Sequence, residues 1–146
     1  MKRFYPTIRV FGVLLTGFSF TLLVPLLLSW HWQDGAESAY DEAFLLTFGT
    51  GLGLWWTARS EKRELKVRDG FLMVVMVWTL LPIYAGLPLI LHLNISFTDA
   101  YFEAVSGLTT TGATVLPNLD ELPPSINLWR GMLVWMGGMG LVVLAV

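Results

Sequence analysis

This chain of 146 residues is 55% hydrophobic and only 14% charged, which is more apolar surface than a soluble core of this size can bury. Lipid must therefore form part of its solvent, and the long apolar runs described next predict an all-α membrane protein. The net charge of −2 gives no reason to expect a nucleic-acid partner. The absence of cysteine excludes a disulfide framework and cysteine-ligated metals.

Four apolar segments have the length of membrane spans. About twenty apolar residues in a helix, at ~1.5 Å per residue, cross the ~30 Å of hydrocarbon in a bilayer. The second segment is the weakest because it contains three glycines, and prolines in the first and third segments predict kinks. The segments are residues 10–30, 40–58, 70–92 and 128–146, the glycines are Gly49, Gly51 and Gly53, and the prolines are Pro25, Pro82 and Pro88.

Basic residues lie on alternate connections between these segments. The connections 31–42 and 93–127 contain no lysine or arginine, and Arg130 is the one basic residue that departs from the alternation. Because basic connections stay in the cytoplasm, the N-terminus and the loop 59–69 are predicted to be cytoplasmic. The residues that carry this prediction are Lys2, Arg3, Arg9, Arg59, Lys62, Arg63, Lys66 and Arg68.

Tryptophans near the segment ends indicate the membrane interfaces, since indole rings favour the headgroup level. Trp30, Trp32 and Trp129 are predicted at the outer interface, and Trp55 and Trp56 at the inner one. The outer connections are acidic, a pattern typical of a solvated face and also of a surface that concentrates cations.

The outer connection contains a short amphipathic helix, predicted over residues 97–107. Its apolar residues recur at helical spacing, and Ser96 followed three residues later by Asp99 reads as a capping box. About eleven residues span ~16 Å, half a bilayer, so the helix is suited to enter from outside and stop midway. Its C-terminus would then point inward with about half a negative charge, which favours a cation. The apolar stripe is Phe97, Ala100, Tyr101, Ala104, Val105 and Leu108.

The segment that follows this helix is rich in threonine and glycine, and we call residues 109–115 the filter segment. Non-helical backbone at membrane depth must be buried in protein or line a water-filled path. Residues 109–113 are predicted to be extended, with carbonyl oxygens aimed at a dehydrated cation such as K⁺. Gly112 permits the dihedral angles that turn successive carbonyls to one side. An ordinary loop between two helices is the alternative.

Three charged residues near this segment have candidate supporting roles. Glu103 is a carboxylate at membrane depth, predicted with Ser106 on the polar face of the short helix, where it either braces neighbouring backbone or anchors the helix in a wet vestibule. Asp99 is explained by capping the helix. Arg130 is a candidate partner of Asp120 or Glu121. Further along, the run 137–140 (GGMG) indicates close helix packing, with a hinge as the alternative.

Several stretches resemble one family. The sequence FTDAYFEAVSGLTTTGATVL (97–116) resembles the first pore loop of the TrkH/TrkG–KtrB potassium-uptake proteins, in the superfamily that includes the plant HKT transporters. WW at 55–56, ELKVRDGFLMVVMVW at 64–78 and LVWMGGMGLVVLAV at 133–146 are similar to other parts of that family, most closely its bacterial TrkH/TrkG branch.

The resemblance implies a specific organisation. It implies an N-terminal transmembrane hairpin (residues 1–60), a cytoplasmic basic loop (61–69) and a first helix–pore loop–helix repeat (70–146). That repeat would comprise a span at 70–92, a pore helix at 97–107, the filter at 109–115 and a span at 128–146. Members of the family have four such repeats around one ion path, so repeats two to four are absent from this sequence.

The resemblance also implies a function. Residues Thr110 and Thr111 would supply the main K⁺-binding carbonyls, with Gly112 and Ala113 flanking them and K⁺ as the transported ion. In plant relatives, serine at the glycine position of the first repeat goes with sodium transport, so Gly112 favours potassium. The implied partners are the remaining pore repeats, the lipid bilayer and a cytosolic nucleotide-binding ring protein. The implied location is the bacterial inner membrane.

With one quarter of a filter, the chain is expected to be a fragment or a truncated product of a potassium transporter. The alternatives are a stand-alone repeat that forms a homotetrameric cation channel and a non-conducting membrane adaptor or remnant. An enzyme is not expected, because the sequence contains no HExxH motif, no Ser–His pairing and no paired intramembrane carboxylates.

Overall fold

The computed structural model describes residues 4–60 and 64–145, and within them the side chains of residue 141 and residues 143–145 are not described. Lys2, Arg3, Lys62, Arg63 and Val146, which entered the sequence predictions, lie outside the described residues. Within the described ranges all regular secondary structure is helical, in agreement with the all-α prediction.

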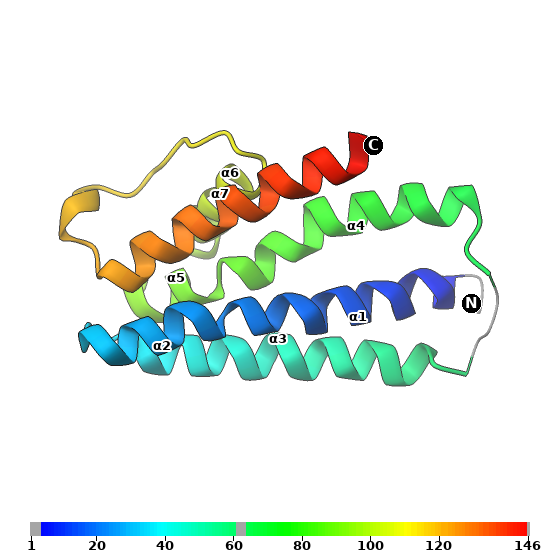
Figure 1. Cartoon of the computed structure of the whole chain (residues 1–146), viewed down its shortest axis with the longest axis horizontal. Coiled ribbons are helices and arrows are strands. Elements are labelled where there is room, and N and C mark those ends of the chain that lie inside the picture. The colour runs from blue at the N-terminus through cyan, green and yellow to red at the C-terminus, as the bar shows by residue number, and fades with distance from the viewer. Residues whose placement is uncertain (1–3, 61–63, 146) are drawn as a thin grey trace.

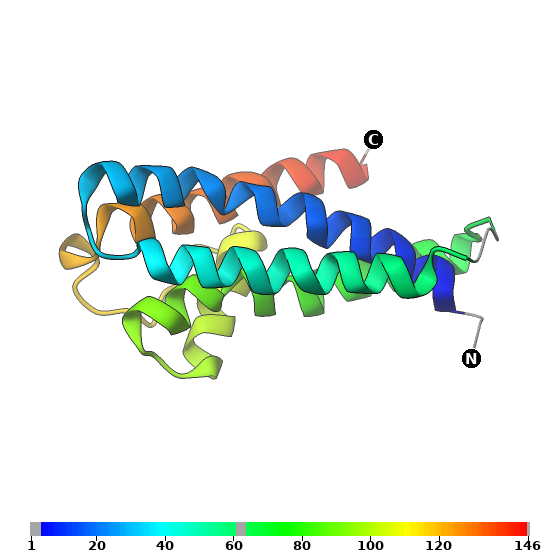
Figure 2. The ribbon, with the colours of Figure 1, turned by 90° about the horizontal axis from the view of Figure 1, so that it is seen from below.

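The helices form an elongated bundle with the short helices α5 and α6 beside it (Figure 1). Helix α3 runs alongside α1 and α2, while α6 packs against α7 and α4. The start of α1, the end of α3 and the start of α4 lie at one end of the bundle, and the α2–α3 turn lies at the other (Figures 1 and 2). The elements are α1 (Tyr5–Thr21), α2 (Leu23–Trp32), α3 (Glu37–Ala58), α4 (Val67–Ala85), α5 (Leu87–Leu93), α6 (Phe97–Leu108), the 3-10 turn η2 (Leu119–Glu121) and α7 (Pro124–Ala145).

Two stretches are long and apolar enough to cross a membrane, judged by length and composition. They are Tyr5–Trp32, which contains α1 and α2, and Val67–Leu93, which contains α4 and α5. Helices α3 and α7 have 22 residues each, which is ~33 Å at the rise of an α-helix. Their role as the second and fourth spans stays a prediction.

Proline accounts for the interruption of the first stretch. Pro25 has no N–H to donate to the Thr21 carbonyl, and the helix is interrupted at Leu22. Helical hydrogen bonding resumes where Leu26 N–H donates to the Leu22 carbonyl (3.2 Å). The second stretch breaks at Gly86, two residues before Pro88. Pro82 lies inside α4, which continues to Ala85. Helix breaks therefore lie close to Pro25 and Pro88, and the kink at Pro82 stays a prediction.

Glycines that weaken the apolar character of α3 allow it to approach α1 closely. A Cβ atom on Gly51 would lie 2.5 Å from the Thr16 hydroxyl, and one on Gly12 would lie 2.7 Å from the Trp55 backbone nitrogen. Small residues are what permit such close contact between helices in membranes. The helix hairpin is thus packed backbone to backbone.

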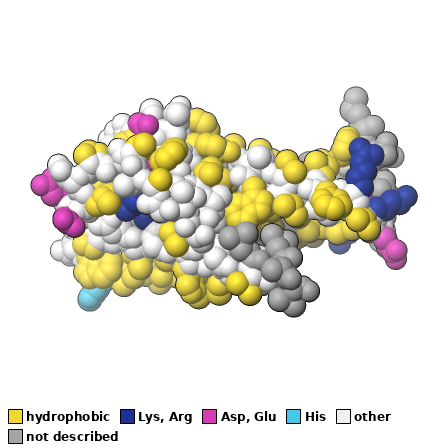
Figure 3. Space-filling model, turned by 90° about the horizontal axis from the view of Figure 1, so that it is seen from above, with side chains coloured by type: hydrophobic (Ala, Val, Ile, Leu, Met, Phe, Trp, Pro, Cys, Tyr) yellow, Lys and Arg dark blue, Asp and Glu magenta, His cyan; other side chains and the backbone are white. Residues whose placement is uncertain are grey.

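The surface between the two ends of the bundle is largely apolar. Figure 3 shows hydrophobic side chains along the helices, with most of the visible lysine and arginine at one end, together with an acidic side chain, and most of the visible acidic side chains toward the opposite end. Exposed large hydrophobic residues include Val13, Phe20 and Leu27 on α1 and α2, and Leu45 and Leu46 on α3. This distribution suits helices that face lipid.

Trp129 is not at the surface, so its predicted place at the outer interface is wrong. Its side chain is fully buried, its indole N–H donates to the Ala85 carbonyl (2.9 Å), and its ring lies 5.8 Å from that of Phe18. Helix α7 begins at Pro124, earlier than predicted, which puts Trp129 in its second turn, against Phe18 of α1 and Ala85 of α4. Trp30, by contrast, is 74% exposed.

Asp34, in the α2–α3 turn, ties the helix hairpin to the start of α7. Its carboxylate accepts hydrogen bonds from the Ser29 hydroxyl, from Ala36 N–H (3.2 Å) and from Ser125 N–H (3.0 Å). Burial alone would raise the pKa of Asp34, but the hydrogen bonds from Ser125, Ser29 and Ala36 outweigh it and hold that pKa below its usual value. A carboxylate at the first turn of α7 also meets the positive end of the helix dipole.

Asp34→Asn is expected to destabilise the fold at neutral pH by about 0.3–1 kcal/mol, because the asparagine oxygen can still accept hydrogen bonds but the negative charge beside the start of α7 is lost. Because the pKa of Asp34 in the folded state is below its unfolded value of 3.8, the stabilisation is complete above that pH and is lost as the pH falls below it. Thermal melting at pH 7 and pH 3 should show parent and variant converging at low pH. Asp41→Asn, on the exposed face of α3, is the control. An equal difference at both pH values would contradict this role.

Candidate functional site

Helix α6 begins as the sequence predicts. The Ser96 hydroxyl accepts a hydrogen bond from Asp99 N–H (3.1 Å), which satisfies one donor of the first turn. Ala100, Ala104 and Leu108 of the apolar stripe are buried, whereas Phe97 is 54% exposed. Asp99 lies in the first turn, where its charge complements the helix dipole.

Glu103 and Ser106, predicted on the polar face of this helix, are shielded from solvent. Glu103 is 4% exposed and Ser106 is 6% exposed. The filter segment returns over this face of α6, so the polar side chains meet backbone rather than water. The hydrophobic period could not predict this, because the covering segment lies later in the chain.

The C-terminus of α6 ends in a Schellman motif. Thr110 N–H donates to the Gly107 carbonyl and Thr111 N–H to the Ser106 carbonyl, both at 2.9 Å. Thr110 occupies the left-handed position of this motif, with φ of 58°, where glycine is usual. The expectation of extended backbone from residue 109 is therefore wrong for Thr109, which caps the helix, and for Thr110.

Two residues of the filter segment have positive φ. For Thr110, a β-branched residue, this conformation costs about 1–2 kcal/mol, so the surrounding structure must hold it in place. Gly112 has φ of 76°, and a Cβ atom added there would meet nothing within 4 Å. The need for glycine at residue 112 is therefore conformational rather than steric.

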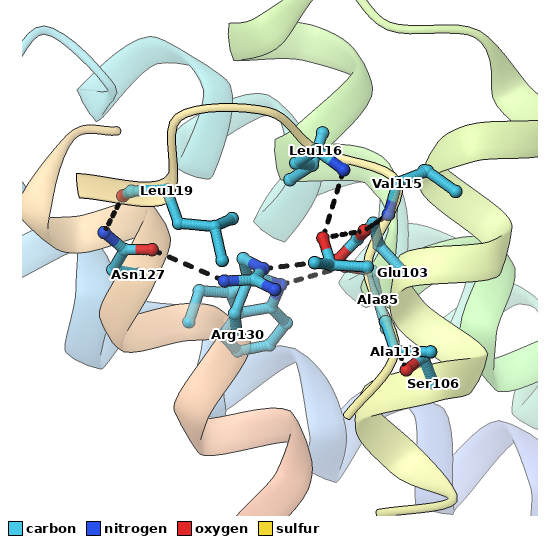
Figure 4. Close-up of polar contacts among 11 residues, drawn as sticks. Ala85, Glu103, Ser106, Ala113, Val115, Leu116, Leu119, Asn127 and Arg130 are labelled. Carbon is cyan, nitrogen blue, oxygen red and sulfur yellow. Dashed lines mark hydrogen bonds and ion pairs between the residues drawn. The ribbon is translucent and has the colours of Figure 1, made fainter. Parts of the chain in front are cut away.

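Glu103 contacts the filter segment from behind (Figure 4). Its Oε1 accepts hydrogen bonds from the Thr114 hydroxyl and from Val115 N–H (2.7 Å), and its Oε2 accepts one from Arg130 Nε (3.2 Å). Of the two predicted roles, a brace on neighbouring backbone is the one that this geometry fits. One carboxylate thus joins α6, the filter segment and α7.

Arg130 pairs with Glu103, not with Asp120 or Glu121 as the sequence suggested. The Arg130–Glu103 pair is partly screened from solvent, with side chains 22% and 2% exposed. Arg130 also donates to the Asn127 side-chain oxygen at 3.5 Å, and Asn127 donates to the Leu119 carbonyl at 2.8 Å. These contacts connect the start of α7 to η2 as well as to the filter segment (Figure 4).

The carbonyl of Ala113 turns toward α6. It accepts a hydrogen bond from the Ser106 hydroxyl at 2.5 Å, so one of its lone pairs is occupied within the chain. The Thr111 hydroxyl lies 2.7 Å from that of Thr109, which in turn bonds the Val105 carbonyl. Residues 109–115 are nevertheless all exposed, so their other side is open. Oxygen atoms are the only ligands that this segment offers, and hard cations prefer them.

The glycine-rich run of α7 packs against the end of α6. A Cβ atom on Gly137 would lie 1.9 Å from the Leu108 carbonyl oxygen, and one on Gly107 would lie 2.9 Å from Leu133 Cβ. A Cβ atom on Gly138 would lie 3.6 Å from the Thr110 methyl group. Close packing, rather than a free hinge, describes this part of α7.

Comparison with known proteins connects these features to a family. The family described as "TrkH: Cation transport protein" matches residues 37–146. The chain is 49% identical over 140 residues to the "Trk system potassium uptake protein TrkH" of Escherichia coli K12. This alignment covers 94% of the chain and 29% of that protein. It is 36% identical over 137 residues to the TrkG protein of the same organism, and this alignment covers 92% of the chain and 28% of TrkG.

A solved structure is similar throughout. The crystal structure of the potassium transporter TrkH from Vibrio parahaemolyticus superimposes with a TM-score of 0.91 at 47% identity, and covers 98% of this chain and 31% of that one. These relatives are named as transport proteins rather than as enzymes, and the chain spans about 30% of their length. The chain belongs to the TrkH family of cation transport proteins.

Proposed function

We propose that this chain is part of a Trk-type potassium uptake protein and supplies one of four strands of its selectivity filter. The observation that carries the proposal is a capped helix of 12 residues that ends in an exposed segment containing two positive-φ residues. Such a helix is about 18 Å long, too short to cross a bilayer. Relatives named as potassium uptake proteins support the choice of ion.

The ion-binding atoms are assigned to the filter segment. The carbonyl oxygens of Thr110 and Thr111 bind K⁺, and Gly112 and Ala113 flank them. Rings of carbonyl oxygens replace the hydration shell of such an ion, and one strand provides only part of a ring. Ala113 is the least suited of the four because its carbonyl already accepts a hydrogen bond from Ser106.

The remaining repeats cover the open side of this segment. Beside it, α7 exposes an apolar face that includes Trp135 (64% exposed), Met139 (48%) and Val142 (64%). The hairpin (1–60), basic loop (61–69) and first repeat (70–146) lie in the bacterial inner membrane with the N-terminus in the cytoplasm. The basic end of the bundle supports this orientation. A cytosolic nucleotide-binding ring protein is the proposed regulatory partner on that side.

Gly112→Ser in the transporter that contains this segment is expected to lower the preference for K⁺ over Na⁺ about tenfold, equivalent to ~1.4 kcal/mol. A side chain disfavours the left-handed backbone of this residue, so the neighbouring carbonyls shift. Uptake of each ion into potassium-starved cells or proteoliposomes measures the preference.

Gly35→Ser is a matched control for this experiment. Gly35 also has positive φ (82°) and open space around it, but it lies in the α2–α3 turn. This control separates backbone strain in general from strain at the filter. An unchanged ion preference in Gly112→Ser, with normal uptake, would refute the filter assignment.

A further inference from the structure

Beyond its positive-φ residues, the filter segment is attached to α6 by two side chains, Ser106 and Glu103. Ser106 donates to the Ala113 carbonyl, while Glu103 Oε1 accepts hydrogen bonds from the Thr114 hydroxyl and from Val115 N–H. Glu103 Oε2 accepts a hydrogen bond from Arg130 Nε, and Arg130 lies on α7. The two oxygens of one carboxylate therefore face two different elements, and rotation of the carboxylate would break contacts on both sides.

Thr110 lies close to Gly138 of α7, but the backbone at Gly112 is not packed against α7. A cavity of about 30 Å³ lies between Gly112 and α7, and Glu103, Ser106 and Arg130 are among the residues that line it. This volume holds about one water molecule, so no side chain fills the space behind Gly112. The position of the strand relative to α7 must then depend on the hydrogen bonds at the rim of the cavity.

We propose that Glu103 and Arg130 form a clamp that fixes the filter strand against α7 and thereby sets the ion preference of the site. This inference rests on the proposed function. Arg130 is a positioning residue in it, since it acts on the strand only through Glu103. Arg130 orients the Glu103 carboxylate, and this carboxylate holds Thr114 and Val115 by hydrogen bonds. The position of these two residues then sets where the carbonyls of Thr111 and Gly112 lie.

The test is a double-mutant cycle in the transporter that contains this chain. Glu103→Gln, Arg130→Gln and the double variant are compared by uptake of K⁺ and Na⁺, with the amount and melting temperature of folded protein measured alongside. Each single variant should lower the preference for K⁺ about tenfold, the size of effect expected from one lost charged hydrogen bond. Because the pair acts as a unit, the double variant should be no worse than either single variant.

Two further variants keep the test decisive if the Glu103 variants do not fold. Thr114→Val removes one donor to Glu103 from an exposed residue with little change of shape, and should lower the preference for K⁺. Thr114→Ser retains the hydroxyl and should preserve it. Asp120→Asn and Glu121→Gln, which remove carboxylates that do not contact the filter segment, are the controls.

Failure of the clamp can be told apart from failure of the filter itself. If Gly112→Ser changes the ion preference while the clamp variants change only stability, the clamp proposal is overturned and the filter assignment stands. Additive effects of Glu103→Gln and Arg130→Gln would also overturn it. If Gly112→Ser leaves the ion preference unchanged as well, the filter assignment fails and the clamp proposal with it.

Discussion

Gly137→Ala is expected to lower the stability of the fold by about 3 kcal/mol, at the upper end of the range for an overpacked site. The added Cβ would lie 1.9 Å from the Leu108 carbonyl oxygen and 2.6 Å from its carbon. Both are backbone atoms at the end of α6, so no side-chain rotation can relieve the contact. Either α7 moves away or the end of α6 is displaced, and the filter segment moves with it.

Two glycines of the same helix provide controls for this experiment. A Cβ atom at Gly131 or Gly140 would meet nothing within 4 Å, so alanine at either residue should be neutral or stabilising, since alanine favours a helix over glycine by about 1 kcal/mol. Thermal unfolding of the purified protein in detergent measures all three variants. If Gly137→Ala has the same melting temperature as Gly140→Ala, α7 does not approach α6 as closely as described.

Local features of the fold were predictable from the sequence because their causes are local. The helical period and the Ser96 cap place α6 at residues 97–108, within one residue of the prediction. The missing N–H of Pro25 explains a break that the sequence already indicated. In each case the residues that determine the feature lie within about one helical turn of it.

The network behind the filter segment was not predictable in this way. Glu103 contacts residues 11 to 27 positions away in sequence, and no periodic pattern encodes such contacts. A signal was nevertheless present. Arg130 was the one basic residue that departed from the charge alternation, and Glu103 was a carboxylate at predicted membrane depth. Pairing these two exceptions would have identified the contact, because buried charges need partners.

The conformation of Thr110 had no signal in the sequence. Threonine is β-branched and favours extended backbone, so a left-handed threonine is the opposite of what propensity predicts. The Schellman motif at the end of α6 and the contact with Gly138 hold this conformation. The backbone preference of threonine is therefore overridden in the segment that the proposed function uses. Backbone strain of this kind is common at functional sites.

Trp129→Ala is expected to cost about 3–5 kcal/mol, the range for removing a fully buried aromatic side chain. Trp129 is 0% exposed, and its indole N–H satisfies the Ala85 carbonyl, which the break between α4 and α5 leaves without a helical partner. Trp129→Phe keeps most of the ring and loses only the donor, so it should cost about 1–3 kcal/mol.

Comparing the two variants separates packing from hydrogen bonding at the junction of α1, α4 and α7. Thermal unfolding of Trp129→Ala and Trp129→Phe should give two clearly different losses of stability. Trp30→Ala, which removes a ring that is 74% exposed, should leave the melting temperature nearly unchanged in detergent. If Trp129→Phe is as stable as the parent, the Ala85 carbonyl has another partner. If Trp129→Ala melts at the same temperature as Trp30→Ala, the indole ring does not hold the start of α7 against the helix hairpin.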